Sequence, residues 1–309
     1  MTQIDTRPGL FESVARITAF TRVMYKPYYL LYAVLWVLAL EGTAAVVAQP
    51  DASWRPTGAT AVRIVVVAAV LLYLRMVDEQ KDLEYDRVHN PDRPLVTGAV
   101  SKGELRTAMG IIAVGAVAGS WLLSGRSALM IAAVLAYGLV LWGLEQASAA
   151  VRGRILLNLV VTYPVQLLIT AYVLLSAIDT GEVAGHGRIA LLALVFAGAF
   201  LQFEFARKTS RVERPGEMYY SNPLGTAGSI AVSLALAALA VAVDLALVRP
   251  WTYTGAVAVI GWIPVALLLI PLAGAQRFRT STEPDYPPVP AMLFIITLYA
   301  ALIAQASAV

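Results

Sequence analysis

The sequence predicts an all-α integral membrane protein in which nine helices cross the bilayer. Its mean hydropathy is +0.71, and hydrophobic residues make up 59% of the chain. Charged residues make up only 14%, whereas soluble proteins carry about a quarter. The alternating pattern typical of a membrane β-barrel is absent. We therefore expect one helical membrane domain over residues 1–309.

Nine apolar segments have the length that a spanning helix needs, which is about 20 residues. They lie at 29–48, 60–77, 105–124, 127–147, 155–177, 187–204, 224–247, 252–274 and 289–308. Several contain Gly, Pro or a polar residue, which bundled membrane helices tolerate because their neighbours satisfy the freed backbone groups. Each segment is therefore expected to span the bilayer.

Basic residues predict the orientation of the bundle. The first 26 residues are polar, carry Arg7, Arg16, Arg22 and Lys26, and lack the apolar core of a cleavable signal peptide. With nine spans, eighteen Lys and Arg residues fall on the N-terminal side and five on the other. Because basic loops stay inside, the N-terminus is expected to be cytoplasmic in a multi-pass cell-membrane protein. The basic loops suit anionic lipid or an anionic substrate, since no nucleic-acid motif accompanies them.

An acidic run directly follows the second predicted span. Asp78, Asp82 and Asp86 recur every fourth residue. If the helix continues, they form a slowly drifting stripe on one face. Stacked carboxylates repel one another unless a cation or a proton neutralises them, and a cation is the favoured explanation.

A second polar group follows the sixth span. Glu204, Arg207, Lys208 and Arg211 stand at i, i+3, i+4 and i+7, so a helix would place them on one face. The two loops are four spans apart, which predicts a parallel pseudo-repeat of spans 1–4 and 5–8 plus a ninth span. A cytoplasmic site between the loops would bind metal through carboxylates and phosphate through cations. Mg²⁺ fits these oxygen ligands, whereas zinc does not, because the chain has two distant histidines and no cysteine.

The acidic run carries a family resemblance. The spaced aspartates are followed by Arg87-Val-His-Asn90-Pro-Asp-Arg93-Pro94-Leu95-Val-Thr-Gly98, and together they resemble the first motif of the UbiA superfamily of intramembrane prenyltransferases. The chain departs from that pattern at Asp78, where Asn is usual. It also departs in the second motif, where Glu204-Phe-Ala-Arg207-Lys208 stands in place of two aspartates.

The resemblance implies a nine-helix bundle of UbiA type that uses Mg²⁺ to ionise an allylic prenyl diphosphate and transfers the prenyl group to an acceptor, aromatic or otherwise. It implies that the catalytic metal ligands are Asp78, Asp82, Asp86 and Glu204. The diphosphate would be bound by Lys81, Arg93, Arg207 and Lys208, and the substrate by Asn158, Tyr163 and Gln166. A dry chamber for the allylic cation would be lined by Tyr73, Tyr137, Trp142, Tyr163 and Tyr172. The segment Glu213–Ser221 would form a lid with a Gly hinge.

Other interpretations of these residues stay open at this point. The aspartates also fit a solvated helix face, and Glu204 with Lys208 fits an i,i+4 ion pair. The aromatic residues also fit ordinary helix packing. Some members of the superfamily are class I terpene cyclases, which use no separate acceptor. A cation transporter is a third possibility, disfavoured because the acids lie at the ends of spans rather than at the midplane.

Overall fold

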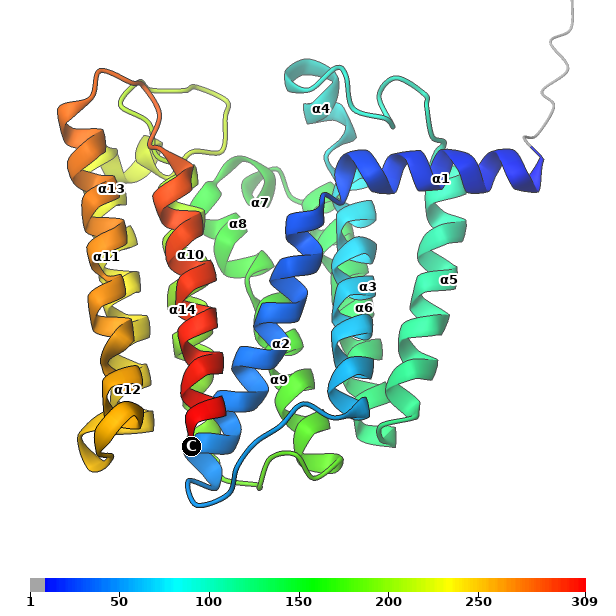
Figure 1. Ribbon diagram of the computed structural model, residues 1–309. Coiled ribbons are helices and arrows are strands. Elements are labelled where there is room, and N and C mark those ends of the chain that lie inside the picture. Colours follow the sequence, from blue (N-terminus) through cyan, green and yellow to red (C-terminus); the bar gives the residue numbers. More distant parts are fainter. Residues whose placement is uncertain (1–8) are drawn as a thin grey trace, which may run out of the picture.

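The computed structural model describes residues 9–309 (Figure 1), so Arg7 lies outside the described residues. Within this range the chain folds into fourteen α-helices and two short 3₁₀ helices. The helices of the first half are α1 (Leu10–Met24), α2 (Pro27–Ala48), α3 (Gly58–Lys81), α4 (Leu83–His89), α5 (Lys102–Trp121), α6 (Gly125–Ala147) and α7 (Ala149–Gly153). Those of the second half are α8 (Ile155–Thr162), α9 (Pro164–Asp179), η1 (Gly187–Leu191), α10 (Leu192–Arg207), α11 (Ser221–Val248), η2 (Pro250–Thr252), α12 (Gly255–Leu267), α13 (Leu269–Thr280) and α14 (Pro288–Ala308).

Eight stretches of the described chain are long and apolar enough to cross a membrane, so this is a multi-pass membrane protein. The ninth predicted segment, 105–124, overlaps α5, which is not among the eight. The first turns of α5 carry Lys102, Glu104 and Arg106, and these charges lower its apolar character. The helical bundle is confirmed, whereas the count of nine spans is not.

The long helices run roughly parallel and form one bundle (Figure 1). The central helix α2 packs against α14, α3 and α9, while α3 also packs against α5 and α6. On the other side α10 packs against α11 and α14. The connections α3–α5, α10–α11 and α13–α14 lie at one end of the bundle, and the C-terminus lies at the opposite end (Figure 1). Helix α1 lies across the first end, nearly perpendicular to the spans.

Two of the predicted spans are interrupted. The segment 155–177 divides at Tyr163, because Pro164 begins α9 and has no backbone N–H with which to continue α8. The segment 252–274 divides at Leu268 into α12 and α13. In α11, Gly225 adopts φ +69°, a left-handed conformation that glycine tolerates without steric cost, and it kinks the helix near its start.

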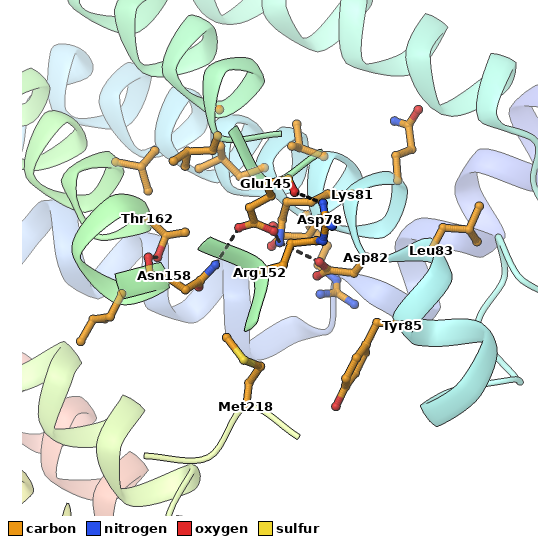
Figure 2. A pocket seen from close by; sticks show the side chains of 18 of the residues that line it. Asp78, Lys81, Asp82, Leu83, Tyr85, Glu145, Arg152, Asn158, Thr162 and Met218 are labelled. Carbon is orange, nitrogen blue, oxygen red and sulfur yellow. Dashed lines mark hydrogen bonds and ion pairs between the residues drawn. The ribbon is translucent and has the colours of Figure 1, made fainter. Parts of the chain in front are cut away.

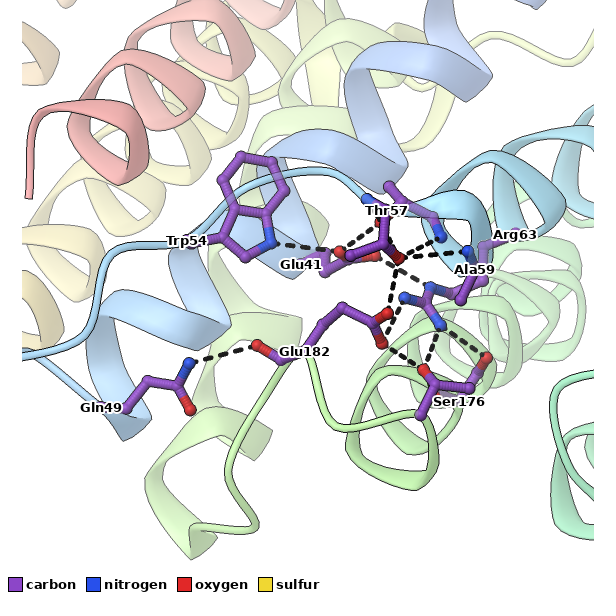
Figure 3. A network of polar contacts seen from close by, with 10 residues as sticks. Glu41, Gln49, Trp54, Thr57, Ala59, Arg63, Ser176 and Glu182 are labelled. Atoms are coloured by element: carbon purple, nitrogen blue, oxygen red, sulfur yellow. Dashed lines mark hydrogen bonds and ion pairs between the residues drawn. The ribbon is translucent and has the colours of Figure 1, made fainter.

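A buried ionic network joins helices at the end of the bundle where the C-terminus lies (Figure 3). The fully buried Arg63 of α3 lies 2.9 Å from a carboxylate oxygen of Glu41 in α2 and 2.9 Å from one of Glu182. Arg63 also donates to the hydroxyls of Ser176 and Thr180 at 3.2 and 2.8 Å. Buried charges are tolerated when they are paired and hydrogen-bonded, so this network fixes α2 and α3 against the end of α9.

Candidate active site

A cavity of about 1380 Å³ opens between the two halves of the bundle. Its size exceeds the ~300–1,000 Å³ typical of small-molecule pockets. Seven basic and six acidic side chains line it, together with apolar residues such as Leu74, Leu141 and Phe200. Asp78 and Asp82 reach it from the end of α3, and Glu204, Arg207 and Lys208 reach it from the end of α10. A nearly balanced set of charges above an apolar interior suits an anion that arrives with a cation and carries an apolar tail.

Asp78 and Asp82 lie on the cavity wall and surround Lys81 (Figure 2). The Lys81 ammonium lies 2.7 Å from a carboxylate oxygen of Asp82 and 3.8 Å from one of Asp78. The two aspartate side chains are 47% and 37% exposed, so their remaining oxygens are accessible from the cavity. Lys81 also ends α3, where a positive charge complements the helix dipole. Two accessible carboxylates beside one ammonium form the acidic wall of the cavity.

The prediction of a continuous acidic stripe on one helix face is wrong at Asp86. The helix breaks at Asp82, whose backbone adopts φ −91° and ψ 8°. Leu83 then packs into the core, and the buried Asp86 carboxylate pairs with Arg93 and accepts a hydrogen bond from Asn90 at 2.9 Å. Asp86 does not line the cavity. Arg93 does line it, but it also lies 3.0 Å from Glu79, so two carboxylates hold this guanidinium.

Glu204, Arg207 and Lys208 line the opposite wall as one ion-paired cluster. Arg207 donates to Oε2 of Glu204 through Nε at 2.7 Å and contacts the same oxygen through a terminal nitrogen at 2.6 Å. Lys208 contacts Oε1 at 2.8 Å. The local i,i+4 ion pair is therefore present, and both Glu204 oxygens are engaged. The expected shared face ends there, because α10 stops at Arg207 and Arg211 turns away to donate to carbonyls that follow α13, including that of Ser281 at 3.2 Å.

The three predicted substrate residues, Asn158, Tyr163 and Gln166, all line the cavity. Asn158 donates to Glu145 at 2.9 Å, and the other Glu145 oxygen lies 2.9 Å from Lys81 (Figure 2). Glu145 is thus a buried link between the aspartate wall and the broken fifth span. The predicted site omitted Glu145, although an ionisable residue inside a span is itself a signal of function.

Most of the expected aromatic lining lies elsewhere. Tyr163 lines the cavity, but Tyr73, Tyr137, Trp142 and Tyr172 do not. Tyr73 and Tyr137 instead donate to the carbonyls of Leu135 and Val161, so they serve helix packing. The aromatic residues that do reach the cavity include Tyr85, Phe200, Tyr219 and Tyr220.

The predicted lid, Glu213–Ser221, contributes four cavity-lining residues, Glu217 to Tyr220. Its Gly216 adopts φ +81° and makes the turn. The guanidinium of Arg214 contacts both carboxylate oxygens of Asp285, at 2.9 and 2.7 Å, and this contact raises the pKa of Arg214. The segment is therefore fastened to the α13–α14 connection. Its motion stays a prediction.

The residues present fit an Mg²⁺ ion that a ligand helps to coordinate. No group of three or more acidic, histidine or cysteine side chains in residues 9–309 is arranged to hold a metal by itself. Mg²⁺ retains several waters and is commonly bound by one or two carboxylates plus substrate phosphates. The accessible oxygens of Asp78 and Asp82 supply that smaller set.

Among known proteins, the chain is similar to several solved structures. No protein-family model matches the sequence, and no curated protein matches it. A UbiA homologue from Archaeoglobus fulgidus bound to DMAPP and Mg²⁺ superimposes with a TM-score of 0.62 at 16% identity, covering 94% of this chain and 99% of that one. A UbiA homologue from Aeropyrum pernix K1, in its apo form, gives 0.58 at 20% identity over 88% and 96% of the two chains.

A third solved structure, of a digeranylgeranylglyceryl phosphate synthase, gives a TM-score of 0.61 at 13% identity. It covers 96% of this chain and 100% of that one. The likeness extends over nearly the full length of all three proteins. The chain therefore has the UbiA fold.

Proposed function

We propose that this chain is an Mg²⁺-dependent intramembrane prenyltransferase of UbiA type, which ionises an allylic prenyl diphosphate and transfers the prenyl group to an acceptor. The main observation that supports this proposal is the cavity. Its two walls set accessible carboxylates opposite a cationic cluster, above an apolar interior. The fold supports the proposal, since UbiA homologues have been solved with DMAPP or GPP and Mg²⁺ bound. The basic loops at the same end predict that the cavity faces the cytoplasm.

In this mechanism Asp78 and Asp82 would hold Mg²⁺ while Arg207 and Lys208 bind diphosphate oxygens. When bound, Mg²⁺ neutralises charge on the diphosphate and favours its departure. The allylic C–O bond breaks and its electron pair leaves with the diphosphate. Arg207 and Lys208 stabilise the negative charge that develops there. The allylic carbon then bonds to the acceptor, whose proton passes to the departing diphosphate, while Tyr163 and Phe200 keep the inner part of the cavity apolar.

A product assay tests this proposal. Purified protein with Mg²⁺ is expected to release diphosphate from a prenyl diphosphate of farnesyl or geranylgeranyl length, and chelation by EDTA is expected to stop the release. Mass spectrometry of products with and without an aromatic acceptor then separates two reactions. A conjugate that requires acceptor supports the transferase, whereas a cyclic hydrocarbon formed without acceptor identifies a terpene cyclase. Release that continues unchanged in EDTA contradicts the metal dependence.

Replacing Glu204 by glutamine distinguishes its two possible roles. Both Glu204 oxygens are engaged by Arg207 and Lys208, so we expect the variant to misplace these cations. The KM for prenyl diphosphate should then rise roughly tenfold, a loss of about 1.4 kcal/mol. The Mg²⁺ concentration for half-maximal rate should stay unchanged. If that concentration rises instead while KM is constant, Glu204 is a metal ligand, as the resemblance implies.

A further inference from the structure

Three carboxylates surround the ammonium of Lys81 (Figure 2), and we call Lys81, Asp78, Asp82 and Glu145 the Lys81 cluster. The ammonium lies 2.7 Å from an oxygen of Asp82, 2.9 Å from one of Glu145 and 3.8 Å from one of Asp78. Asp78 and Lys81 belong to α3, whereas Glu145 comes from the end of α6. Asn158 fixes the other Glu145 oxygen by a hydrogen bond of 2.9 Å. The ammonium therefore joins carboxylates of two helices, as a bound cation does.

The charges of the Lys81 cluster leave room for one divalent cation. Three carboxylates and one ammonium carry an excess of two negative charges, which a single Mg²⁺ neutralises. Lys81 contacts only Oδ1 of Asp78 and of Asp82, and within residues 9–309 no ion pair or hydrogen bond engages their Oδ2 atoms. Each aspartate thus retains one oxygen for a metal ion. Both Glu145 oxygens, in contrast, are engaged by Lys81 and Asn158.

The opposite wall of the cavity is also supplied with cations. Oε1 of Glu204 lies 2.8 Å from Lys208, and Oε2 lies 2.6 Å from Arg207. A metal ion at Glu204 would have to displace one of these two side chains. On both walls, a cation of the chain itself takes the carboxylate contacts that a further metal ion would need.

We propose that Lys81 takes the place of a further metal ion, so that the site binds the diphosphate with a single Mg²⁺. An ammonium carries three donors. Contacts with Asp82 and Glu145 use two of them, whereas the 3.8 Å to Asp78 exceeds the length of an N–H···O hydrogen bond. The third donor is available for a diphosphate oxygen. Lys81 would then bridge the carboxylates and the diphosphate, as a metal ion does.

This inference rests on the proposed function and adds the number of metal ions to it. Lysine is a compact point charge that stays attached to the chain, so it remains in the site when no diphosphate is bound. The Lys81 and Glu145 side chains are only 12% and 4% exposed, and buried charges are tolerated when they are paired. A metal ion that left with the diphosphate would leave the buried Glu145 carboxylate without a partner. Lys81 keeps that carboxylate paired in both states.

The test counts bound Mn²⁺ by EPR, with protein in nanodiscs of zwitterionic lipid and inorganic diphosphate as the ligand. Mn²⁺ is paramagnetic and takes the same oxygen ligands as Mg²⁺. The wild type should bind about one Mn²⁺ per chain, whereas Lys81→Ala should bind about two, because three carboxylates then surround a vacated position. The spectrum of that variant should be broadened by two neighbouring spins. Mn²⁺ should also raise its unfolding temperature by several degrees more than that of the wild type, since the metal replaces the partner of Glu145.

Two further variants serve as controls. Lys102→Ala removes another lysine that lines the cavity but lies outside the Lys81 cluster, and it should keep the wild-type count of Mn²⁺. Lys81→Ala combined with Glu145→Gln removes the third carboxylate and should also return the count to the wild-type value. This double variant leaves no buried carboxylate unpaired in the cluster, so it should fold without metal.

Two Mn²⁺ per wild-type chain would overturn the proposal, and so would an unchanged count in Lys81→Ala. That variant is prepared with Mn²⁺ present throughout. If it fails to fold there while the double variant folds, a metal ion cannot replace Lys81, and the proposal fails as well. Calorimetry on the same samples measures diphosphate binding. If the wild type binds no diphosphate, or binds it without Mn²⁺, the proposed function fails. If it binds diphosphate with two Mn²⁺, only the single-metal inference fails.

Discussion

Replacing Asp78 and Asp82 together by alanine is expected to lower the rate of diphosphate release by at least about a hundredfold, which corresponds to about 2.7 kcal/mol in the barrier. These two carboxylates are accessible from the cavity and lie opposite the cationic cluster. Without them the diphosphate would have no protein-held metal to neutralise its leaving charge. The measurement is diphosphate release from a prenyl diphosphate at saturating Mg²⁺.

A matched control is Asp92→Ala, because Asp92 is an exposed aspartate in the loop between α4 and α5 and does not line the cavity. It should leave the rate unchanged. Lys81 retains its contact with Glu145 at 2.9 Å in the double variant, so the local fold should persist and the unfolding temperature should stay close to that of the wild type. Wild-type rates in Asp78→Ala and Asp82→Ala would contradict the metal site.

The sequence predicted the bundle well because a spanning helix leaves a long apolar run that needs no knowledge of its neighbours. It did not predict where helices break under tertiary forces. At Asp82 the turn is set by the burial of Leu83 and by the attraction of Arg93 for Asp86. Arg93 follows Asp86 by seven residues in an irregular loop, and helical spacing does not place it. The break at Pro164 did have a local signal.

Residues of the candidate site could be predicted from the sequence where they lie close together along the chain. Asp78 and Asp82 stand in one short motif, and their cavity position follows from it. In contrast, the rings of Tyr32, Phe200 and Tyr299 pack together from three different spans, with Tyr32 lying 6.4 Å from Phe200 and 6.0 Å from Tyr299 between ring centroids. No spacing in the sequence brings these rings together. The tyrosines predicted to line the chamber were chosen only by the span in which they lie. Tyr73 is one that packs between helices instead, because one helix presents side chains to several neighbours at once.

The largest effect on stability is expected from Arg63→Ala. Arg63 is fully buried and holds two carboxylates, those of Glu41 and Glu182 (Figure 3). Removing one partner of a buried ion pair costs about 3–5 kcal/mol, because the remaining charge has no partner. Here Arg63 is the shared partner of both acids, so we expect the upper part of that range. Thermal unfolding in detergent should show a decrease of at least about 5 °C in the apparent Tm.

Acid should weaken the same network. Partial burial acts to raise the pKa of Glu182, but hydrogen bonds from Thr180 and Thr57 and the charge of Arg63 together hold that pKa below its usual value. A carboxyl with a lowered pKa stabilises the folded state fully above its unfolded pKa, and the contribution is lost as pH falls through the folded value. The Tm difference between wild type and Arg63→Ala should therefore persist at pH 7 and shrink below about pH 4.5.

The decisive comparison is with Arg126→Ala at the same end of the bundle. Arg126 pairs with Asp179, but its side chain is 65% exposed, and exposed pairs contribute about 0–1 kcal/mol. Loss of the Arg126 side chain should change the Tm little.

Adding Glu41→Gln to Arg63→Ala should restore part of the lost stability, because it removes one of the two carboxylates left without a partner. If Arg63→Ala and Arg126→Ala are equally mild, water replaces the guanidinium, and the network does not hold α2 and α3 to α9. If only the Arg63 variant is unstable and Glu41→Gln partly rescues it, the buried charge pairing holds these helices together.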